Sequence, residues 1–205
     1  MIVHRFCNMH NTGIVILAAG SSSRLGSPKQ LLPFQNKNLL QHVIDEATAT
    51  GAVPVVVVTG ARSEVISAAI DTSNADVVWN EQWPEGKASG IVAGVRRIVS
   101  SYPQVEYIIL AVCDQPFVSA GLFTQLFEKQ LFSKKNIVAS AYADTLGTPV
   151  LLGRKYFDAL LALKEDEGAR KILMMHRDDV AGVDFPLGHI DIDTQADYDS
   201  LTVIS

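Results

Sequence analysis

Residues 14–33 of this chain read Ile-Val-Ile-Leu-Ala-Ala-Gly-Ser-Ser-Ser-Arg-Leu-Gly-Ser-Pro-Lys-Gln-Leu-Leu-Pro. The apolar run at residues 14–19 predicts a strand of a parallel sheet that is covered on both faces. A loop of small residues follows the strand, and its backbone N–H groups can approach an anion closely. Arg24 and Lys29 add a guanidinium and an ammonium to this loop, and both groups bind phosphate oxygens well. The stretch therefore indicates a phosphate or nucleotide site at the end of a buried strand.

Two well-known phosphate-binding loops do not match this stretch. A Walker A loop ends in Gly-Lys-Ser or Gly-Lys-Thr, whereas Gly26 is followed by Ser27. A dinucleotide-binding loop reads Gly-x-Gly-x-x-Gly, whereas Gly20 is followed by serines. The second mismatch argues against an oxidoreductase that uses NAD. That class stays as an alternative, together with a nucleotide-binding module that lacks catalytic activity.

Length and composition indicate a folded globular protein. The chain has 205 residues, 48% hydrophobic and 19% charged, so we expect one domain over residues 1–205. The net charge of -5 argues against a nucleic-acid-binding surface. No apolar run reaches the roughly 18 residues of a membrane-spanning helix, and the N-terminus lacks the apolar core of a signal peptide, so we expect a cytoplasmic protein that binds no membrane. Cys7 and Cys113 are too few for a disulfide framework or a thiolate zinc site.

Strand and helix patterns alternate along the chain, which predicts an α/β fold. Further strands are expected at residues 53–59, 76–79, 107–112 and 137–142, and helices at 39–47, 65–70, 91–99, from Ser119 onward and at 156–163. Asn38 is expected to cap the first helix, which carries His42 as either a catalytic base or a satisfied core histidine. Ligands of such folds bind beyond the carboxyl ends of the strands, which places Thr59 and Gly60 near the site.

A carboxylate follows the predicted strand at residues 107–112. Asp114 stands where a parallel strand delivers its last side chains to the ligand crevice, a position that suits the Mg²⁺ accompanying a nucleoside triphosphate. The alternative is that Asp114 caps a turn before Pro116. We interpret Cys113 as a small core residue.

A second group of carboxylates lies near the C-terminus. Asp191 and Asp193 alternate with isoleucines, so a short strand would turn both carboxylates toward one cavity, where they would need a cation. Thr194 and Asp197 have the spacing of a capping box and are explained as helix-start residues.

Four motifs resemble those of the MobA-like NTP transferase family and, within it, the molybdenum cofactor cytidylyltransferases. They are Leu-Ala-Ala-Gly-x-x-x-Arg-Leu-Gly-x-x-Lys at residues 17–29, Asn80 with Trp83, Gly86 and Ser89, Cys-Asp-x-Pro at residues 113–116, and Asp-Ile-Asp-Thr at residues 191–194. The resemblance covers most of the chain. It implies a Rossmann-like three-layer α/β fold with a mostly parallel central sheet, of the nucleotide-diphospho-sugar transferase type.

The resemblance also implies a reaction and a set of site residues. The expected enzyme transfers a nucleoside monophosphate to a phosphate-bearing acceptor, with molybdopterin favoured, and releases pyrophosphate. Members with Leu-Ala-Ala-Gly tend to use CTP, so CTP is favoured, while GTP and other small phosphate acceptors stay as alternatives. A molybdoenzyme or its chaperone is the implied protein partner. The implied residues are Arg24, Lys29 and Asp114 for catalysis; Leu17, Ala18, Ala19, Gly20, Arg24, Lys29, Gly86 and Ser89 for the nucleotide; Thr148 and Arg170 for the acceptor; and Asp114 and Asp193 for Mg²⁺.

The chain departs from the family pattern at two positions, and two assignments have a structural alternative. Gly90 stands where members often have serine, and Thr148 where they often have histidine. Trp83 and Ser89 either lie against the base and ribose or serve as a core aromatic and a helix cap. Arg170 either binds the acceptor's phosphate or pairs with Asp166 on a helix.

Overall fold

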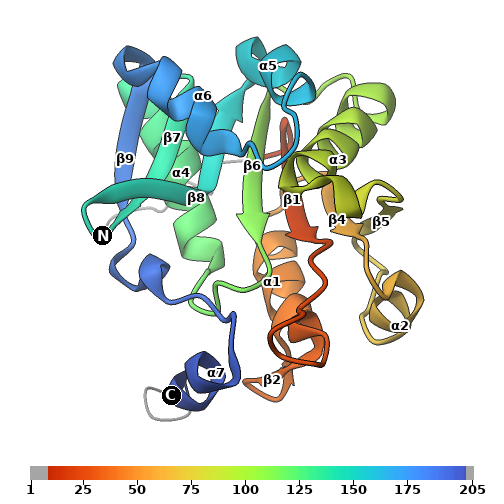
Figure 1. Ribbon diagram of the computed structural model, residues 1–205. Coiled ribbons are helices and arrows are strands. Elements are labelled where there is room, and N and C mark those ends of the chain that lie inside the picture. The colour runs from red at the N-terminus through yellow and green to blue at the C-terminus, as the bar shows by residue number, and fades with distance from the viewer. Residues whose placement is uncertain (1–8, 202–205) are drawn as a thin grey trace.

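The computed structural model describes residues 9–201 (Figure 1). Cys7 and the N-terminal residues on which the expectation about a signal peptide rests lie outside the described residues. Within the described part, no helix has both the length and the apolar character needed to cross a membrane.

A seven-stranded sheet in the order β5-β4-β1-β6-β8-β7-β9 forms the middle of the molecule (Figure 1). Its strands are β1 (Thr12–Ala18), β4 (Val55–Thr59), β5 (Asp76–Trp79), β6 (Tyr107–Val112), β7 (Ile137–Tyr142), β8 (Thr145–Gly153) and β9 (Val180–Asp184). Strand β8 runs antiparallel to its neighbours β6 and β7, whereas the other neighbouring pairs are parallel. The sheet is therefore mostly parallel, as predicted. A separate hairpin pairs β2 (Pro33–Phe34) with β3 (Lys37–Asn38).

Helices cover both faces of this sheet and make two cores. Helices α1 (Leu39–Thr48), α2 (Ser63–Ala68) and α4 (Ala120–Ser133) contribute to one core, and α3 (Lys87–Ser101), α5 (Phe157–Leu161) and α6 (Ala169–Met175) to the other. Successive residues of β1 alternate between the two, since Ile14 and Ile16 belong to the first core and Val15 to the second. This arrangement is the expected three-layer α/β fold. Helix α7 (Gln195–Leu201) ends the described chain.

Helix α3 packs unusually close to the sheet at Gly94. A Cβ atom at this position would lie 2.4 Å from Cγ1 of Val15. Only glycine therefore lets α3 approach β1 at this point, and the approach brings the first turn of α3 to the carboxyl ends of the strands.

Two predicted helix starts are confirmed, and other element boundaries differ from the prediction. The Asn38 side chain accepts a hydrogen bond from the Gln41 N–H (2.7 Å), and the Ser119 hydroxyl accepts one from the Leu122 N–H (3.2 Å). Helix α3 begins four residues before the predicted start at residue 91, because Gly86 precedes it without a side-chain cap that the sequence would reveal. The predicted strand at residues 191–193 is wrong, since this segment has no strand partner and lies between a 3₁₀ turn and α7.

Candidate active site

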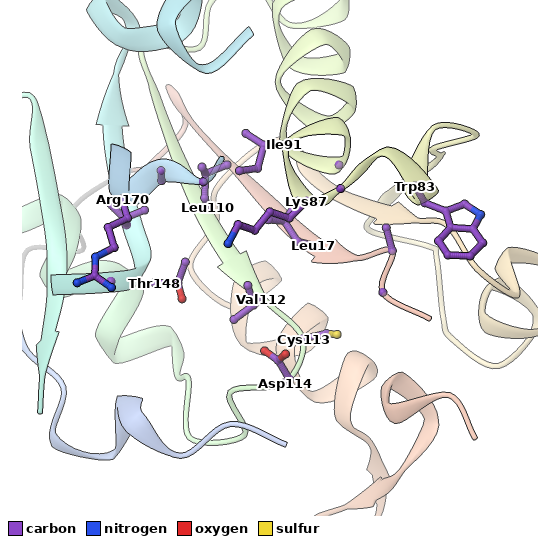
Figure 2. Close-up of a pocket in the computed structure, with 18 of the residues that line it drawn as sticks. Leu17, Trp83, Lys87, Ile91, Leu110, Val112, Cys113, Asp114, Thr148 and Arg170 are labelled. Carbon is purple, nitrogen blue, oxygen red and sulfur yellow. The ribbon is translucent and has the colours of Figure 1, made fainter. Parts of the chain in front are cut away.

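A cavity of about 740 Å³, here called the main cavity, opens at the carboxyl ends of β1 and β6 (Figure 2). Leu17 and Val112, which are register partners on these strands, both line it. Asp114 lies at the same edge, two residues beyond the end of β6. The predicted site residues that line the main cavity are Leu17, Ala19, Gly20, Lys29, Gly86, Asp114, Thr148 and Arg170. The structure thus brings together residues from five separate segments of the chain.

Loop 20–29 is fastened to the end of β1 by Gln30, a residue that the sequence analysis missed. The buried Gln30 amide donates to the carbonyl oxygens of Ala18 (2.8 Å) and Gly20 (3.0 Å). Its Oε1 accepts from the Ser22 hydroxyl, and Ser22 Oγ in turn accepts from the Lys29 N–H. These bonds fix the loop's path, so that Lys29 turns back toward β6.

Lys29 holds two carboxylates at once. Its Nζ lies 2.6 Å from Oδ2 of Asp114 and 2.9 Å from Oδ1 of Asp193, and the other carboxylate oxygen of Asp193 lies 2.8 Å from a guanidinium nitrogen of Arg24. The Lys29 side chain is 13% exposed, whereas that of Arg24 is 66% exposed. The structure thus brings Asp114 and Asp193, the two predicted metal ligands, to one place, and the cation between them is the Lys29 side chain, a contact that the sequence analysis did not predict.

This cluster changes the proton affinities of its members. Burial acts to lower the pKa of Lys29, but the charges and hydrogen bonds of Asp114 and Asp193 outweigh it and raise the pKa above its usual value. The Lys29 hydrogen bond lowers the pKa of Asp193, while burial and the charges of Asp114 and Asp193 raise the pKa of Asp191. Lys29 is therefore fully charged at neutral pH. Asp191 is close enough to the other two carboxylates to be repelled by them.

The donor set is suitable for a divalent cation of the Mg²⁺ type. Within residues 9–201, no group of three or more His, Cys, Asp or Glu side chains is arranged to hold a metal ion. Mg²⁺ does not require such a group, because one or two carboxylates with phosphate and water oxygens complete its shell. Asp114 and Asp193 supply two carboxylates that already approach one cation from two sides.

The start of α3 forms the next wall and carries a lysine that the sequence analysis did not select. Lys87 is the first residue of α3, lines the main cavity and reaches into it (Figure 2). Gly86 has φ +108°, and a Cβ there would lie 2.4 Å from the carbonyl oxygen of Glu165. Glycine is required at this position for both reasons. The start of α3 therefore sits directly on the loop that precedes α6.

Strand β8 and helix α6 supply the remaining wall. Thr148 and Arg170 both line the main cavity, and Figure 2 shows them on one side of it. The alternative role of Arg170, an ion pair with Asp166, does not occur, because α6 begins only at Ala169 and the i, i+4 pair in this region joins Glu167 to Lys171.

Several predicted residues lie beside the main cavity without lining it. Ala18 is buried in the core; Asp193 belongs to the cluster around Lys29 without lining the main cavity, and Arg24 contacts this cluster through Asp193. Ser89 links two segments, since its hydroxyl accepts from the Asn80 amide (2.8 Å) and donates to the Gly86 carbonyl (2.8 Å). Ser89 therefore shapes the start of α3, and its contact with the nucleotide stays a prediction.

The residues at the end of β4 are also excluded from the lining. The Thr59 hydroxyl is 2.7 Å from that of Ser63, and a Cβ at Gly60 would lie 2.6 Å from Cβ of Trp83. Thr59 and Gly60 thus lie behind the residues that line the main cavity and do not face it. Trp83 itself is 36% exposed and lines the main cavity, so it is not a core aromatic.

The remaining structural interpretations are confirmed. Nε2 of His42 lies 3.2 Å from the Val118 carbonyl in the core, which excludes a role for His42 as a base in the main cavity. Oδ2 of Asp197 accepts from the N–H and hydroxyl of Thr194, as in a capping box. Cys113 is almost completely buried, and burial raises the pKa of its thiol to about 12.

Comparison with known proteins identifies a matching family and several relatives of this chain. Residues 14–180 match the family model described as the MobA-like NTP transferase domain. The chain is 29% identical over 167 residues to a probable molybdenum cofactor guanylyltransferase of Bacillus anthracis. These aligned residues cover 80% of this chain and 74% of the relative. It is also 29% identical over 141 residues to nicotine blue oxidoreductase of Paenarthrobacter nicotinovorans. These aligned residues cover 68% of this chain and 66% of the oxidoreductase.

A similar fold occurs among solved structures. Rv0371c from Mycobacterium tuberculosis H37Rv superposes with a TM-score of 0.81 and 30% identity, covering 95% of this chain and 98% of that one. In its complex with manganese, Rv0371c superposes with a TM-score of 0.76 and 28% identity, covering 93% and 97%.

Proposed function

We propose, because this chain belongs to the MobA-like NTP transferase family, that it transfers CMP from CTP to a phosphate-bearing acceptor and releases pyrophosphate. The acceptor we propose is the molybdopterin of the molybdenum cofactor, since one relative is named a probable molybdenum cofactor guanylyltransferase. The observation that carries the proposal is the meeting of Lys29, Asp114 and Asp193 beside loop 20–29. Cations, carboxylates and a small-residue loop are the groups that a triphosphate and its metal require.

In the proposed reaction, an oxygen of the acceptor's phosphate attacks the α-phosphorus of CTP. A new P–O bond forms, the bond to the β-phosphate breaks, and pyrophosphate leaves with the electron pair. Because this chemistry needs mainly alignment and neutralisation of charge, the chain supplies no covalent intermediate. Lys29 and Arg24 would bind the triphosphate oxygens and the leaving pyrophosphate.

Asp114 and Asp193 would hold Mg²⁺ together with oxygens of the triphosphate. When bound, the metal neutralises charge on the triphosphate and the leaving group. Lys29, which contacts both carboxylates, would share them with the metal, and its ammonium would also bind the triphosphate. The manganese complex of Rv0371c supports a divalent metal in a protein of this fold.

The choice of CTP rests on residues 17–20, Leu-Ala-Ala-Gly. Ala19 lines the main cavity, and we propose that its methyl group excludes the larger purine base. Discrimination by one such group is typically about 1 to 3 kcal/mol, or roughly 10- to 200-fold. We expect calorimetric titration with Mg²⁺ present to give a lower Kd for CTP than for GTP. Equal or tighter binding of GTP would contradict this choice and would favour the guanylyl transfer named for the relative.

The overall proposal is tested by release of pyrophosphate. Purified protein is incubated with each of the four nucleoside triphosphates and Mg²⁺, with and without molybdopterin. We expect release with CTP that depends on molybdopterin. Release with CTP and another phosphate acceptor would keep the reaction but change the acceptor.

An oxidoreductase is the second candidate, because one relative of similar identity is named nicotine blue oxidoreductase. The same preparation is therefore tested for binding of NADH and NADPH. Binding of either, without binding of any nucleoside triphosphate, would replace the transferase proposal.

A further inference from the structure

Lys87 brings an unpaired positive charge to the main cavity. Its side chain lines the cavity and extends into it from the first turn of α3 (Figure 2). Among the hydrogen bonds and ion pairs of residues 9–201, none involves the Lys87 ammonium, whereas Lys29 in the same cavity makes two ion pairs.

The position of Lys87 is fixed by contacts of its neighbours. The Ala88 N–H donates to the Glu165 carbonyl (3.0 Å), and Gly86 packs against the same carbonyl. The Lys87 stem passes Gly168, where an added Cβ would lie 3.6 Å from Cε of Lys87. Gly168 is two residues before Arg170, and Lys87 and Arg170 both line the main cavity, so the docking of α3 on this loop brings two cationic residues to one cavity.

The surroundings of Lys87 favour an anionic ligand. Ile91, Leu110 and Leu173 give this part of the cavity apolar walls. Asp114, the carboxylate that lines the cavity, is engaged by Lys29, and Asp166 lies against Gly86 without forming an ion pair with Lys87. A charged group beside apolar walls is stabilised when a ligand supplies the opposite charge.

We infer that Lys87 of the α3 wall, together with Arg170 of the wall formed by α6 and β8, binds the phosphate monoester of the acceptor. This inference rests on the proposed function, in which the cluster of Lys29 and Asp114 takes the triphosphate and leaves these two walls to the second substrate. Lys87 exchanges no proton in this role. It holds the attacking phosphate oxygens in place and offsets their repulsion by the triphosphate.

The test compares Lys87→Met with Lys164→Met, a matched control at an exposed lysine outside the main cavity. Inorganic phosphate is titrated calorimetrically into each protein, both free and saturated with CTP and Mg²⁺. We expect Lys87→Met to weaken phosphate binding about tenfold or more, the usual effect of losing one charge-assisted hydrogen bond, while the Kd for CTP changes less than twofold. Lys87→Arg should retain most of the phosphate affinity, and Lys164→Met should behave as the wild type. In turnover with molybdopterin, Lys87→Met should raise KM for the acceptor more than KM for CTP.

Two results would overturn the inference. Unchanged phosphate binding in Lys87→Met would make Lys87 a solvated surface lysine. A loss of CTP affinity equal to the loss of phosphate affinity would assign Lys87 to the triphosphate. A wild-type protein that binds no nucleoside triphosphate would defeat the proposed function instead, and the titration of phosphate into the free proteins would still decide the role of Lys87.

Discussion

At the scale of single residues, the site depends on one ammonium that serves two carboxylates. Asp114 and Asp193 would repel each other if they shared a site without a cation, and Lys29 removes that repulsion with contacts of 2.6 and 2.9 Å. The carboxylates are therefore held in position before any metal arrives. A metal that binds as proposed would redistribute these contacts and would not have to bring the two carboxylates together first.

Replacing either carboxylate with its amide should separate activity from folding. Asp114→Asn and Asp193→Asn keep the size of the side chain and remove its charge, so the fold should survive while Mg²⁺-dependent turnover falls by roughly 10²-fold or more. The double variant should cost little beyond the worse single variant, because the two carboxylates act as a unit. The measurement is turnover against Mg²⁺ concentration, with thermal unfolding recorded for each protein.

Asp191→Asn is the matched control. Asp191 is repelled by both other carboxylates, which raises its pKa, and it makes no ion pair with Lys29. Its loss should therefore reduce turnover much less. An inactive Asp191→Asn beside an active Asp193→Asn would move the ligand by two residues, and full activity of Asp114→Asn would remove the metal site from the mechanism.

The sequence predicted the residues that carry motifs and missed those whose role depends on tertiary packing. Asp114 and Asp193 were predicted to share one Mg²⁺ and Lys29 to bind the triphosphate; these roles stay predictions, and the structure places the Lys29 ammonium between the two carboxylates. Gln30 was missed because nothing in its sequence context shows that its amide turns inward to bond the end of β1. Lys87 was missed because the start of α3 has no side-chain cap and lies among glycine and serine residues.

At the scale of elements, Asp179 joins three segments at the edge of the sheet. Its carboxylate accepts hydrogen bonds from the N–H of Asn136, just before β7, and from the Tyr156 hydroxyl and the Lys155 ammonium, in the 3₁₀ turn after β8. Burial acts to raise the pKa of Asp179, but these hydrogen bonds outweigh it and hold the pKa well below its usual range.

The network at Asp179 makes stability depend on pH. Because the folded pKa is lowered, the stabilisation is fully present above the unfolded value of about 3.9 and is lost as pH falls below it toward the folded value. We expect Asp179→Asn to reduce the free energy of unfolding by about 1 to 3 kcal/mol at pH 7, with a smaller difference from the wild type below pH 4. Urea unfolding at both pH values measures this effect.

Asp178→Asn provides the comparison for this prediction. Asp178 is an exposed neighbour whose carboxylate lies outside the network. Equal destabilisation by both substitutions would show that a change in the 3₁₀ turn that contains both residues, and not the loss of the network, accounts for the effect.

Elements were predictable from the sequence where a run of apolar residues marks a buried strand. They were less predictable where the direction or the existence of a strand depends on its pairing with another strand. The parallel strands β1, β4 and β6 were predicted from their apolar runs, whereas apolarity says nothing about direction and did not reveal that β8 is antiparallel. The alternation at residues 190–193 looked like a strand. It arises because Ile192 is buried in a small core and its N–H donates to the Asp114 carbonyl, with no neighbouring strand.

At the scale of the whole molecule, the C-terminal segment closes the site that the N-terminal loop begins. Ile192 and Leu201 pack with Phe34 and Leu39 in a small core, against which Leu25 of loop 20–29 also packs. The Tyr198 hydroxyl donates to the Pro33 carbonyl (2.8 Å). Within residues 9–201, no strand of the main sheet follows residue 184, so this segment adds to the site without adding to the sheet.

Truncation after His189 should therefore leave a folded protein with a defective site. We expect the truncated protein to keep the circular dichroism spectrum of an α/β protein and to unfold at a lower Tm, because Phe34 and Leu39 lose the apolar side chains that bury them. CTP affinity in the presence of Mg²⁺ should fall about tenfold or more. Full-length Asp193→Asn is the control that isolates the carboxylate, so any larger loss on truncation measures the packing of the loop. Wild-type CTP affinity in the truncated chain would show that loop 20–29 is held by Gln30 alone.

The contact between Arg24 and Asp193 joins residues 169 positions apart, so a ribosome makes the guanidinium long before its carboxylate partner. At about 5–20 residues per second, it needs roughly ten to thirty seconds between the two residues. In this interval the remaining six strands of the main sheet, β4 to β9, are synthesised while Asp193 is still missing from the cluster. We expect a chain that stops before Asp193 to form the main sheet and to leave Lys29 with one carboxylate partner, so the sheet and the cluster are assembled at different times during synthesis.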